Sequence, residues 1–261
     1  MVGMIDSHAH LNDPRFRADL SDVVERAQEA GVAAIINVGY DLPSSQCAVK
    51  LAERFESLWA VVGLHPHDAK LWDEEVQRGL LELAGHPKVL AIGEAGMDYY
   101  YDNSPRDEQR AVFRAQLALA EELGLPVVVH SREAAKDTLD ILSEYPQVPC
   151  LLHCYSGSLE MARDYMQMGH YFSFGGPITF QNASRLRSVV EGIPLEHILL
   201  ETDCPYLTPH PHRGKRNEPA YVGLIAQKLA EIHGVSVEEV VRVTSENTRK
   251  FFRMPDEEDS R

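Results

Sequence analysis

The sequence predicts an α/β fold, a TIM-type (β/α)8 barrel, and three observations lead to it. Short runs rich in Val, Ile and Leu alternate with longer stretches that have helical spacing. There are eight apolar runs, and eight is the number of strands in this barrel. The length of 261 residues suits one barrel of about 250 residues, with a doubly wound open sheet as the alternative.

The predicted strands are short and mostly apolar, as strands buried on both faces of a parallel sheet are. The first, Met-Ile-Asp-Ser-His, ends in polar residues, whereas Ala-Ala-Ile-Ile-Asn-Val and Leu-Trp-Ala-Val-Val-Gly are nearly continuous apolar runs. In order, the strands lie at residues 4–8, 33–38, 58–63, 89–93, 126–130, 149–153, 171–175 and 197–202.

The stretches between these runs predict helices. Residues 20–30, 105–123 and 133–143 show it most clearly, because apolar residues recur at i, i+3, i+4 and i+7 with charges between them. A helix after each strand supplies the long crossover that parallel strands require.

No linker rich in Gly, Ser or Pro divides the chain. We therefore expect one domain over residues 1–255, followed by a short acidic tail at 256–261. The 25 Lys and Arg against 40 Asp and Glu give a net charge of −15, which argues against a protein that coats nucleic acid or an anionic membrane.

Cysteine usage and the apolar runs bear on the compartment. Four cysteines without a CxxC pair indicate reduced thiols. The first residues lack a signal-peptide pattern, and the apolar runs fall far short of the roughly 20 residues that span a bilayer. We expect a cytoplasmic protein without a membrane partner, and no obligate protein partner is evident.

The strongest functional signal is His8 and His10 at the end of the first predicted strand. Alternate side chains of a strand point to the same side, so histidines at i and i+2 converge. The alternative, two polar residues at a strand end, is the less favoured reading of the pair.

Further residues of ligand type lie at the ends of other predicted strands. Glu94 and Asp203 directly follow two strands, and His130 and His153 end two more. In a barrel these strand ends share one face, where the active sites of this fold are built. Individually, the histidines could be core residues and the carboxylates helix caps; their coincidence on one face favours a metal site.

Nitrogen and carboxylate ligands suit Zn²⁺, Mn²⁺, Fe²⁺ or Co²⁺ better than an all-oxygen Ca²⁺ cage. Six ligands exceed what one catalytic ion uses, so we expect two divalent ions bridged by Glu94. His8, His10 and Asp203 would complete one site, and His130 and His153 the other. A hydroxide held by the ions would be the nucleophile, and Asp203 could take its proton, which makes Glu94 and Asp203 the expected catalytic carboxylates.

Seven ordered segments of the chain match a known pattern. They are residues 6–11, 63–67, 93–100, 130–132, 153–157, 201–207 and 211–219. These motifs resemble the TatD family of metal-dependent deoxyribonucleases, within the metallo-dependent hydrolase superfamily. The resemblance implies a TIM-type barrel, a divalent metal site in which Mg²⁺ is a further candidate, and hydrolysis of phosphodiester bonds in DNA. It carries the ligand role to the same six residues.

The resemblance also makes His65 an expected substrate residue that contacts the scissile phosphate; a turn histidine beside Pro66 is the alternative. Asp98 is expected to orient a ligand histidine or, alternatively, to cap the following helix. Glu201 lies two residues before Asp203 and is expected to reach the lumen.

Arg213, Lys215 and Arg216 follow the last predicted strand and form a local positive cluster. Guanidinium groups bind phosphate well, so we expect this loop to contact DNA unless it is an ordinary solvated loop. Arg132 is a weaker candidate of the same kind. The tyrosines at 99–101 could stack bases or pack at the barrel rim.

Two cysteines, Cys154 and Cys204, adjoin expected ligands. Strand alternation predicts that both face the helices as buried thiols. No Walker loop, GxGxxG after a strand or GxSxG is present, which gives no support to nucleotide-cofactor or serine-hydrolase chemistry.

The functional prediction is a metal-dependent hydrolase of DNA that takes a DNA end transiently into the barrel mouth. A single strand is expected because a deep barrel mouth admits it more readily than a duplex, whereas the 3′ to 5′ direction follows from the family resemblance alone. The alternatives are a superfamily hydrolase acting on an amide, lactone or small phosphoester, and a binding protein without metal.

Overall fold

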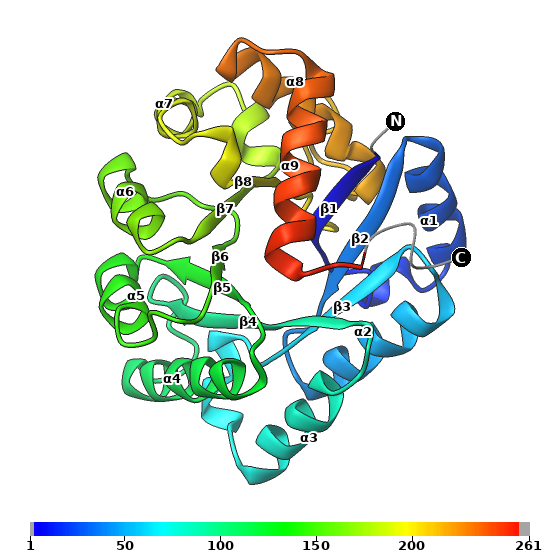
Figure 1. Cartoon of the computed structure of the whole chain (residues 1–261). Coiled ribbons are helices and arrows are strands. Elements are labelled where there is room, and N and C mark those ends of the chain that lie inside the picture. Colours follow the sequence, from blue (N-terminus) through cyan, green and yellow to red (C-terminus); the bar gives the residue numbers. More distant parts are fainter. Residues whose placement is uncertain (1–2, 256–261) are drawn as a thin grey trace.

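The strands of the computed structural model follow one another around a single sheet in chain order. They are β1 (Met4–Ala9), β2 (Val32–Val38), β3 (Leu58–Val62), β4 (Val89–Asp98), β5 (Val127–Arg132), β6 (Cys150–Leu152), β7 (Tyr171–Phe174) and β8 (Ile198–Leu200). All seven pairings between consecutive strands are parallel. The predicted (β/α)8 barrel is confirmed (Figure 1).

Helices surround the strands on the outside. They are α1 (Leu20–Glu29), α2 (Leu42–Arg54), α3 (Glu74–Ala84), α4 (Arg106–Leu123), α5 (Ala135–Leu142), α6 (Leu159–Gln167), α7 (Ser184–Glu191), α8 (Val222–His233) and α9 (Val237–Phe252). Several begin at side-chain caps: Asp41 accepts a hydrogen bond from the Ser44 N–H at the start of α2, and Ser236 accepts one from the Glu239 N–H at α9.

The predicted strand positions hold, but most strand ends differ from expectation, and the differences in β4, β6 and β8 move candidate ligands relative to the strands. β4 continues to Asp98, so Glu94 lies inside the strand instead of following it. β6 and β8 end early, at Leu152 and Leu200, which leaves His153 and Asp203 on irregular backbone beyond the strands. The apolar runs did not predict these strand ends correctly, because strand hydrogen bonding continues through polar residues in β4 and stops before them in β8.

The barrel closes where β1 meets the segment after β8. The Asp203 N–H donates to the His8 carbonyl at 2.9 Å, and the His10 N–H donates to the Cys204 carbonyl at 2.8 Å. Beneath them, the buried Asp6 carboxylate accepts hydrogen bonds from the Thr202 N–H at 2.9 Å and the Thr202 hydroxyl at 2.5 Å. This closing seam places ligand-type residues from the first strand and from the segment after the last strand side by side.

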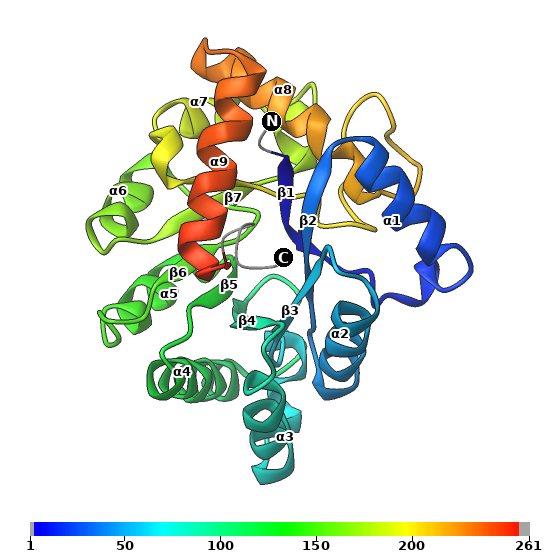
Figure 2. The same ribbon diagram turned by 45° about the vertical axis from the view of Figure 1, so that its right-hand side comes forward.

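Two apolar layers form the core. One lies between the strands and the helices, and the other fills the barrel interior with side chains such as Ile36, Val61 and Val128. Phe251 and Phe252, at the end of α9, pack into the interior layer. Figure 2 shows the end of α9 turned toward the middle of the ring of strands. Because this helix covers one end of the barrel, access to the interior is left to the carboxyl ends of the strands.

The structure describes residues 3–255, so the predicted tail at 256–261 lies outside the described residues. Within that range, no helix combines the length and the apolar character needed to cross a membrane.

Candidate metal centre

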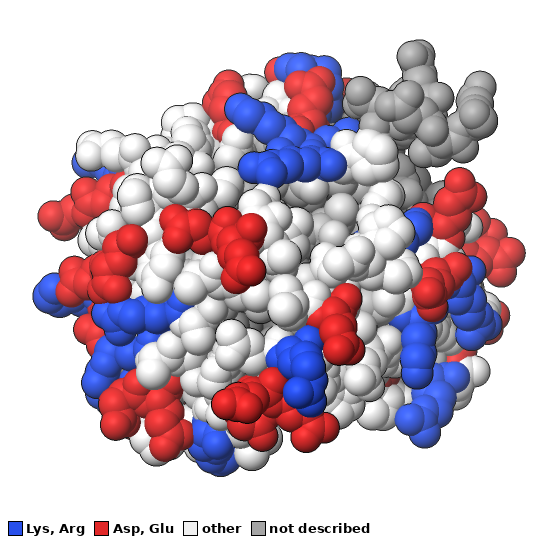
Figure 3. All heavy atoms as spheres, turned by 60° about the horizontal axis from the view of Figure 1, so that its bottom comes forward, with Lys and Arg blue, Asp and Glu red and all other residues white. Residues whose placement is uncertain are grey.

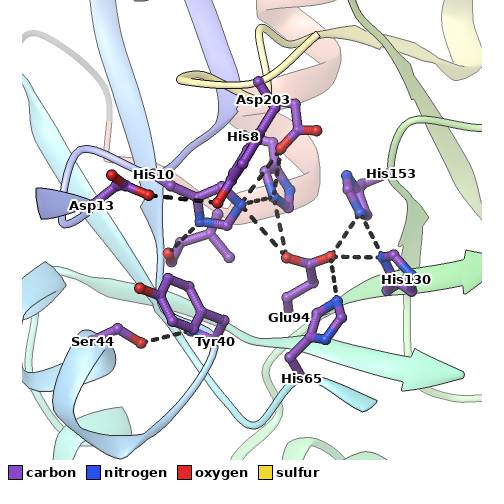
Figure 4. Close-up of polar contacts among 12 residues, drawn as sticks. His8, His10, Asp13, Tyr40, Ser44, His65, Glu94, His130, His153 and Asp203 are labelled. Carbon is purple, nitrogen blue, oxygen red and sulfur yellow. Dashed lines mark hydrogen bonds and ion pairs between the residues drawn. The ribbon is translucent and has the colours of Figure 1, made fainter. Parts of the chain in front are cut away.

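All six predicted ligands converge at the carboxyl ends of the strands. His8 lies in β1, Glu94 in β4 and His130 in β5, while His10, His153 and Asp203 follow β1, β6 and β8. Figure 4 shows the six side chains pointing toward one another, with Glu94 between the two groups of histidines. Glu94 and the two β1 histidines are almost completely buried.

The first group gathers around the Oε2 atom of Glu94. His8 Nε2 lies 3.5 Å and His10 Nε2 3.6 Å from this oxygen, and the two nitrogens are 3.2 Å apart. Asp203 Oδ1 lies 3.5 Å from His10 Nε2 and 4.0 Å from His8 Nε2. This group joins the first strand to the last.

The second group gathers around the other oxygen of the same carboxylate. His130 Nδ1 and His153 Nε2 each lie 2.9 Å from Glu94 Oε1, and they are 3.4 Å from each other. His65 Nε2 is 3.5 Å from the same oxygen. The structure therefore places His65, expected to contact substrate, within reach of a metal on this side as well.

This donor set fits divalent metal. Ligand atoms bound to one zinc-sized ion at about 2.0–2.2 Å are separated from each other by roughly 3–4 Å, which matches the spacings within each group. His8 Nε2 and His10 Nε2 face each other at 3.2 Å, a separation that two nitrogens bound to one such ion would have. The two oxygens of Glu94 address different groups, which is the arrangement of a bridging carboxylate.

Hydrogen bonds orient two of the histidine rings. His10 Nδ1 donates to the Val38 carbonyl at 2.9 Å, which leaves Nε2 free to bind metal. Asp98 Oδ2 lies 3.1 Å from His130 Nε2 and 3.0 Å from His67 Nε2. Asp98 Oδ1 also accepts the N–H groups of the two residues after Tyr99, so Asp98 both contacts a ligand histidine and caps a turn.

A second set of polar atoms lies on the interior side of the histidines. His8 Nδ1, His153 Nδ1 and Glu201 Oε1 are buried and have no hydrogen-bond partner among the described residues. The nearest approach is 3.7 Å, between His153 Nδ1 and Glu201 Oε2, and the latter accepts a hydrogen bond from the Ser173 hydroxyl at 2.6 Å. Glu201 thus brings a negative charge beneath the rings of two candidate ligands.

The carboxylates and histidines shift each other's protonation. Burial raises the pKa of Glu94, but His153, His65 and His130 outweigh burial and hold this pKa well below its ordinary value. Burial lowers the pKa of His153, but Glu94 and Glu201 outweigh it and raise the pKa well above the usual range. Glu94 is therefore ready to bind cations without first losing a proton.

The pKa values of three other histidines shift in different directions. The pKa of His10 is raised because Asp203 and Glu94 outweigh the effect of burial. The pKa of His8 is lowered by burial and by His153. Burial lowers the pKa of His65 to about 4, so its ring is neutral near pH 7. Neutral imidazole is the form that binds metal.

The predicted phosphate-binding loop after β8 has mixed surroundings. Arg213 and Lys215 are exposed, and the Arg213 guanidinium lies 3.8 Å from the centre of the Phe180 ring. Arg216 is instead engaged with two carboxylates: it pairs with Asp19 at 2.6 Å and with Glu218 at 2.9 Å. Positive charge available to a substrate in this loop therefore comes mainly from Arg213 and Lys215.

An open cavity of about 290 Å³ lies beside the histidines. It is lined by His130, His153 and Asp203, together with residues such as Arg132 and Phe174. Its size is near the lower end of small-ligand pockets. It can therefore take one small group next to the metal centre.

Cys154 corrects one expectation. It is not a buried thiol facing the helices but is partly exposed and lines this cavity. Its φ of 45° breaks the strand alternation that the expectation assumed. Cys204 is buried in the outer core as expected.

Sequence patterns missed Asp6 and Tyr206. Asp6 holds the closing seam, and its signal was a carboxylate inside an otherwise apolar strand. The Tyr206 ring lies 6.2 Å from the His10 ring and is exposed, but a single tyrosine in a loop carried no pattern.

The chain is similar to known proteins over nearly its whole length. The family described as TatD related DNase matches residues 5–253. An uncharacterized metal-dependent hydrolase of Bacillus subtilis, YabD, is 46% identical over 96% of this chain and 99% of its own length. A protein of Klebsiella pneumoniae named 3′-5′ ssDNA/RNA exonuclease TatD is 36% identical over 95% of this chain and 97% of its own. The crystal structure of the Escherichia coli TatD homolog YJJV superposes with a TM-score of 0.92 at 30% identity, covering 98% of this chain and 100% of that one.

Proposed function

This chain belongs to the TatD-related DNase family, and from that premise we propose that it hydrolyses phosphodiester bonds at the 3′ end of single-stranded DNA. The protein is a metal-dependent hydrolase of this family, and the proposal concerns its substrate. The observation that carries the proposal is the Glu94 carboxylate, whose two oxygens each face a separate set of ligand nitrogens.

We assign two divalent ions to these sets. His8, His10 and Asp203 would hold one, His130 and His153 the other, and Glu94 both. Divalent ions there would supply Lewis-acid activation of water and neutralise the charge that develops on the phosphoryl oxygens. Metals of the series Mg²⁺, Mn²⁺, Zn²⁺, Fe²⁺ and Co²⁺ are the candidates.

The residues of the chain have separate tasks in this proposal. Asp203 accepts the proton of the attacking water; its pKa is lowered because His10 and His8 outweigh the effect of burial, so it is ionised at neutral pH. His65, neutral near pH 7, lies beside Glu94 and is placed to contact a phosphoryl oxygen. Asp98 orients His130 through a hydrogen bond, and the Glu201 carboxylate, 3.7 Å from His153 Nδ1, acts on His153 through its charge.

The size of the cavity favours a strand end over a duplex, and the charge of the chain offers DNA little general attraction. The cavity beside His130 and His153 accommodates about one nucleotide unit. On the face shown in Figure 3, Lys and Arg side chains are interspersed with Asp and Glu around an area of mainly uncharged residues. On an acidic chain with this mixed surface, attraction of DNA depends on the metal centre and on nearby cations such as Arg213 and Lys215.

The test uses single-stranded oligonucleotides labelled at the 5′ or the 3′ end. We expect early release of the 3′ label as mononucleotide, loss of activity with EDTA, and recovery on adding a divalent metal. Glu94→Ala should abolish activity and lower metal content, whereas Glu82→Ala, at an exposed position of α3, should do neither. A metal-loaded protein that leaves DNA and RNA intact but cleaves a lactone, amide or small phosphoester would overturn the proposal.

A further inference from the structure

Exposed aromatic side chains gather at the barrel end that carries the metal centre. Tyr100 and Tyr101, after β4, are 55% and 54% exposed, and Tyr206, after β8, is 47% exposed. Among residues 3–255, only three other large apolar side chains are comparably exposed: Leu71, Leu81 and Val235. Large rings left in water beside an active site are a common sign of a binding surface.

On each side of the barrel mouth, a tyrosine ring lies next to a histidine ring that belongs to, or adjoins, the metal centre. The Tyr101 ring lies 5.4 Å from the His67 ring, which in turn lies 4.3 Å from His65. The Tyr206 ring lies 6.2 Å from the ring of the candidate ligand His10. In a ring of eight strands, β4 and β8 are four positions apart, so the two groups lie on opposite sides of the barrel mouth.

An arginine lies against each group. The Arg132 guanidinium is 4.4 Å from the centre of the Tyr100 ring and 4.8 Å from that of Tyr101. The Arg15 guanidinium is 4.3 Å from the centre of the Tyr206 ring and also pairs with Asp13 at 2.7 Å. Such cation–π contacts restrict the rings and place positive charge next to an aromatic surface.

We propose that Tyr100 with Tyr101, and Tyr206 across the mouth, are two stacking platforms for bases of single-stranded nucleic acid on either side of the metal centre. This inference rests on the proposed function, because it names how the same site recognises its substrate. Every base has an aromatic face, so these platforms bind without regard to sequence. They select single strands, since the faces of bases inside a duplex are already stacked on one another. Arg132 is placed to meet an adjoining phosphate, whereas Arg15 is already paired with Asp13 and serves to hold the Tyr206 ring.

The test compares Tyr206→Ala and the double variant Tyr100→Ala/Tyr101→Ala with Tyr206→Phe, which keeps the ring. Leu81→Ala, which removes an exposed apolar side chain on α3, is the control. For a single-stranded oligonucleotide, we expect KM to rise about 5-fold to about 100-fold in the alanine variants, with a much smaller change in kcat. Tyr206→Phe and Leu81→Ala should keep the wild-type KM, and metal content should be equal in all variants.

A second readout reports stacking without catalysis. An oligonucleotide with 2-aminopurine near its 3′ end and phosphorothioate linkages that resist hydrolysis is titrated with the metal-loaded protein. Stacking on a tyrosine quenches the 2-aminopurine fluorescence, and we expect the quenching to fall in the alanine variants and to remain in Tyr206→Phe.

The outcomes separate this inference from the proposed function. Wild-type cleavage of single-stranded DNA, with KM and quenching unchanged in the alanine variants, overturns the stacking platforms and leaves the proposed function standing. Equal losses in Tyr206→Phe and Tyr206→Ala would assign the effect to the hydroxyl group and also overturn stacking. A wild-type protein that does not act on single strands overturns both.

Discussion

Replacing Asp98 by Asn tests how far the metal centre depends on a residue that does not itself bind metal. In the structure, Oδ2 of Asp98 faces Nε2 of both His130 and His67, at 3.1 Å and 3.0 Å. His130 offers its other nitrogen to the centre, so Nε2 must carry the proton and donate it to Asp98. With Oδ1 still accepting its two backbone N–H groups, Asn would point an N–H₂ donor at these N–H donors.

The expected size of the effect follows from these contacts. Losing the carboxylate partner of a ligand histidine typically weakens metal binding by about 10- to 100-fold. Both contacts are slightly longer than the roughly 2.7–2.9 Å of strong charge-assisted bonds, so we expect the lower part of that range. A loss of about 10- to 30-fold corresponds to about 1.4–2 kcal/mol.

The assay is a titration of the metal-free protein with Zn²⁺ or Co²⁺ against a competing chelator, which resolves two binding steps. Only the step that involves His130 should weaken in Asp98→Asn. Asp137→Asn is the matched control, because Asp137 accepts a hydrogen bond from the Tyr99 hydroxyl at 2.6 Å and pairs with Arg110, and neither of these partners among residues 3–255 is a ligand histidine. Unchanged binding in both steps, or equal weakening of both, would refute the reasoning.

Three further predictions concern protonation and charge. Metal affinity should fall as pH falls, because the raised pKa values of His10 and His153 let protons compete with metal; calorimetric titrations in buffers of different ionisation enthalpy should detect proton release, and pH-independent affinity would contradict this. Burial raises the pKa of Asp6 to about 8 against 3.8 in the unfolded chain, so its contribution to stability is complete below about pH 4 and is lost as pH rises to 8. In urea unfolding, the free energy of unfolding of the wild type should therefore fall relative to that of Asp6→Asn, by at most about 1.4 kcal/mol per pH unit over this interval. The exposed control Asp22→Asn should show the same pH dependence as the wild type. A difference between the wild type and Asp6→Asn that does not change with pH would count against this prediction. Glu201→Gln should lower metal affinity about tenfold in the same chelator assay by removing the charge beneath the ligand rings, and full affinity would exclude that role.

The barrel and its ligands were predictable for a simple physical reason. Parallel strands buried on both faces must be short apolar runs, and their carboxyl ends must meet on one side. Residues such as His130 and Asp203 follow those runs directly, so their convergence could be inferred without coordinates. The family resemblance added an expected substrate class, but it gave none of the distances between the ligand atoms.

Contacts between distant loops could not be predicted in this way. The ion pairs of Arg216 with Asp19 and Glu218 depend on how the loop after β8 folds back over the start of α1. The place of Cys154 depends on its own left-handed backbone conformation, two residues after β6 ends. Local patterns carry no information on either, because each is decided by the packing of the whole barrel mouth.

The closing seam also has a kinetic meaning. Asp6 and Thr202 are 196 positions apart, so bringing them together closes nearly the whole chain into a loop, at a cost in entropy that local contacts do not have. The pairing of His8 with Asp203 lies on the same seam, and one of the proposed ions would tie its two sides. Such an ion would be fully coordinated only after the barrel has closed, and it would then stabilise the closed seam. Its release should accompany the earliest parting of β1 from the segment after β8, well before the chain as a whole unravels.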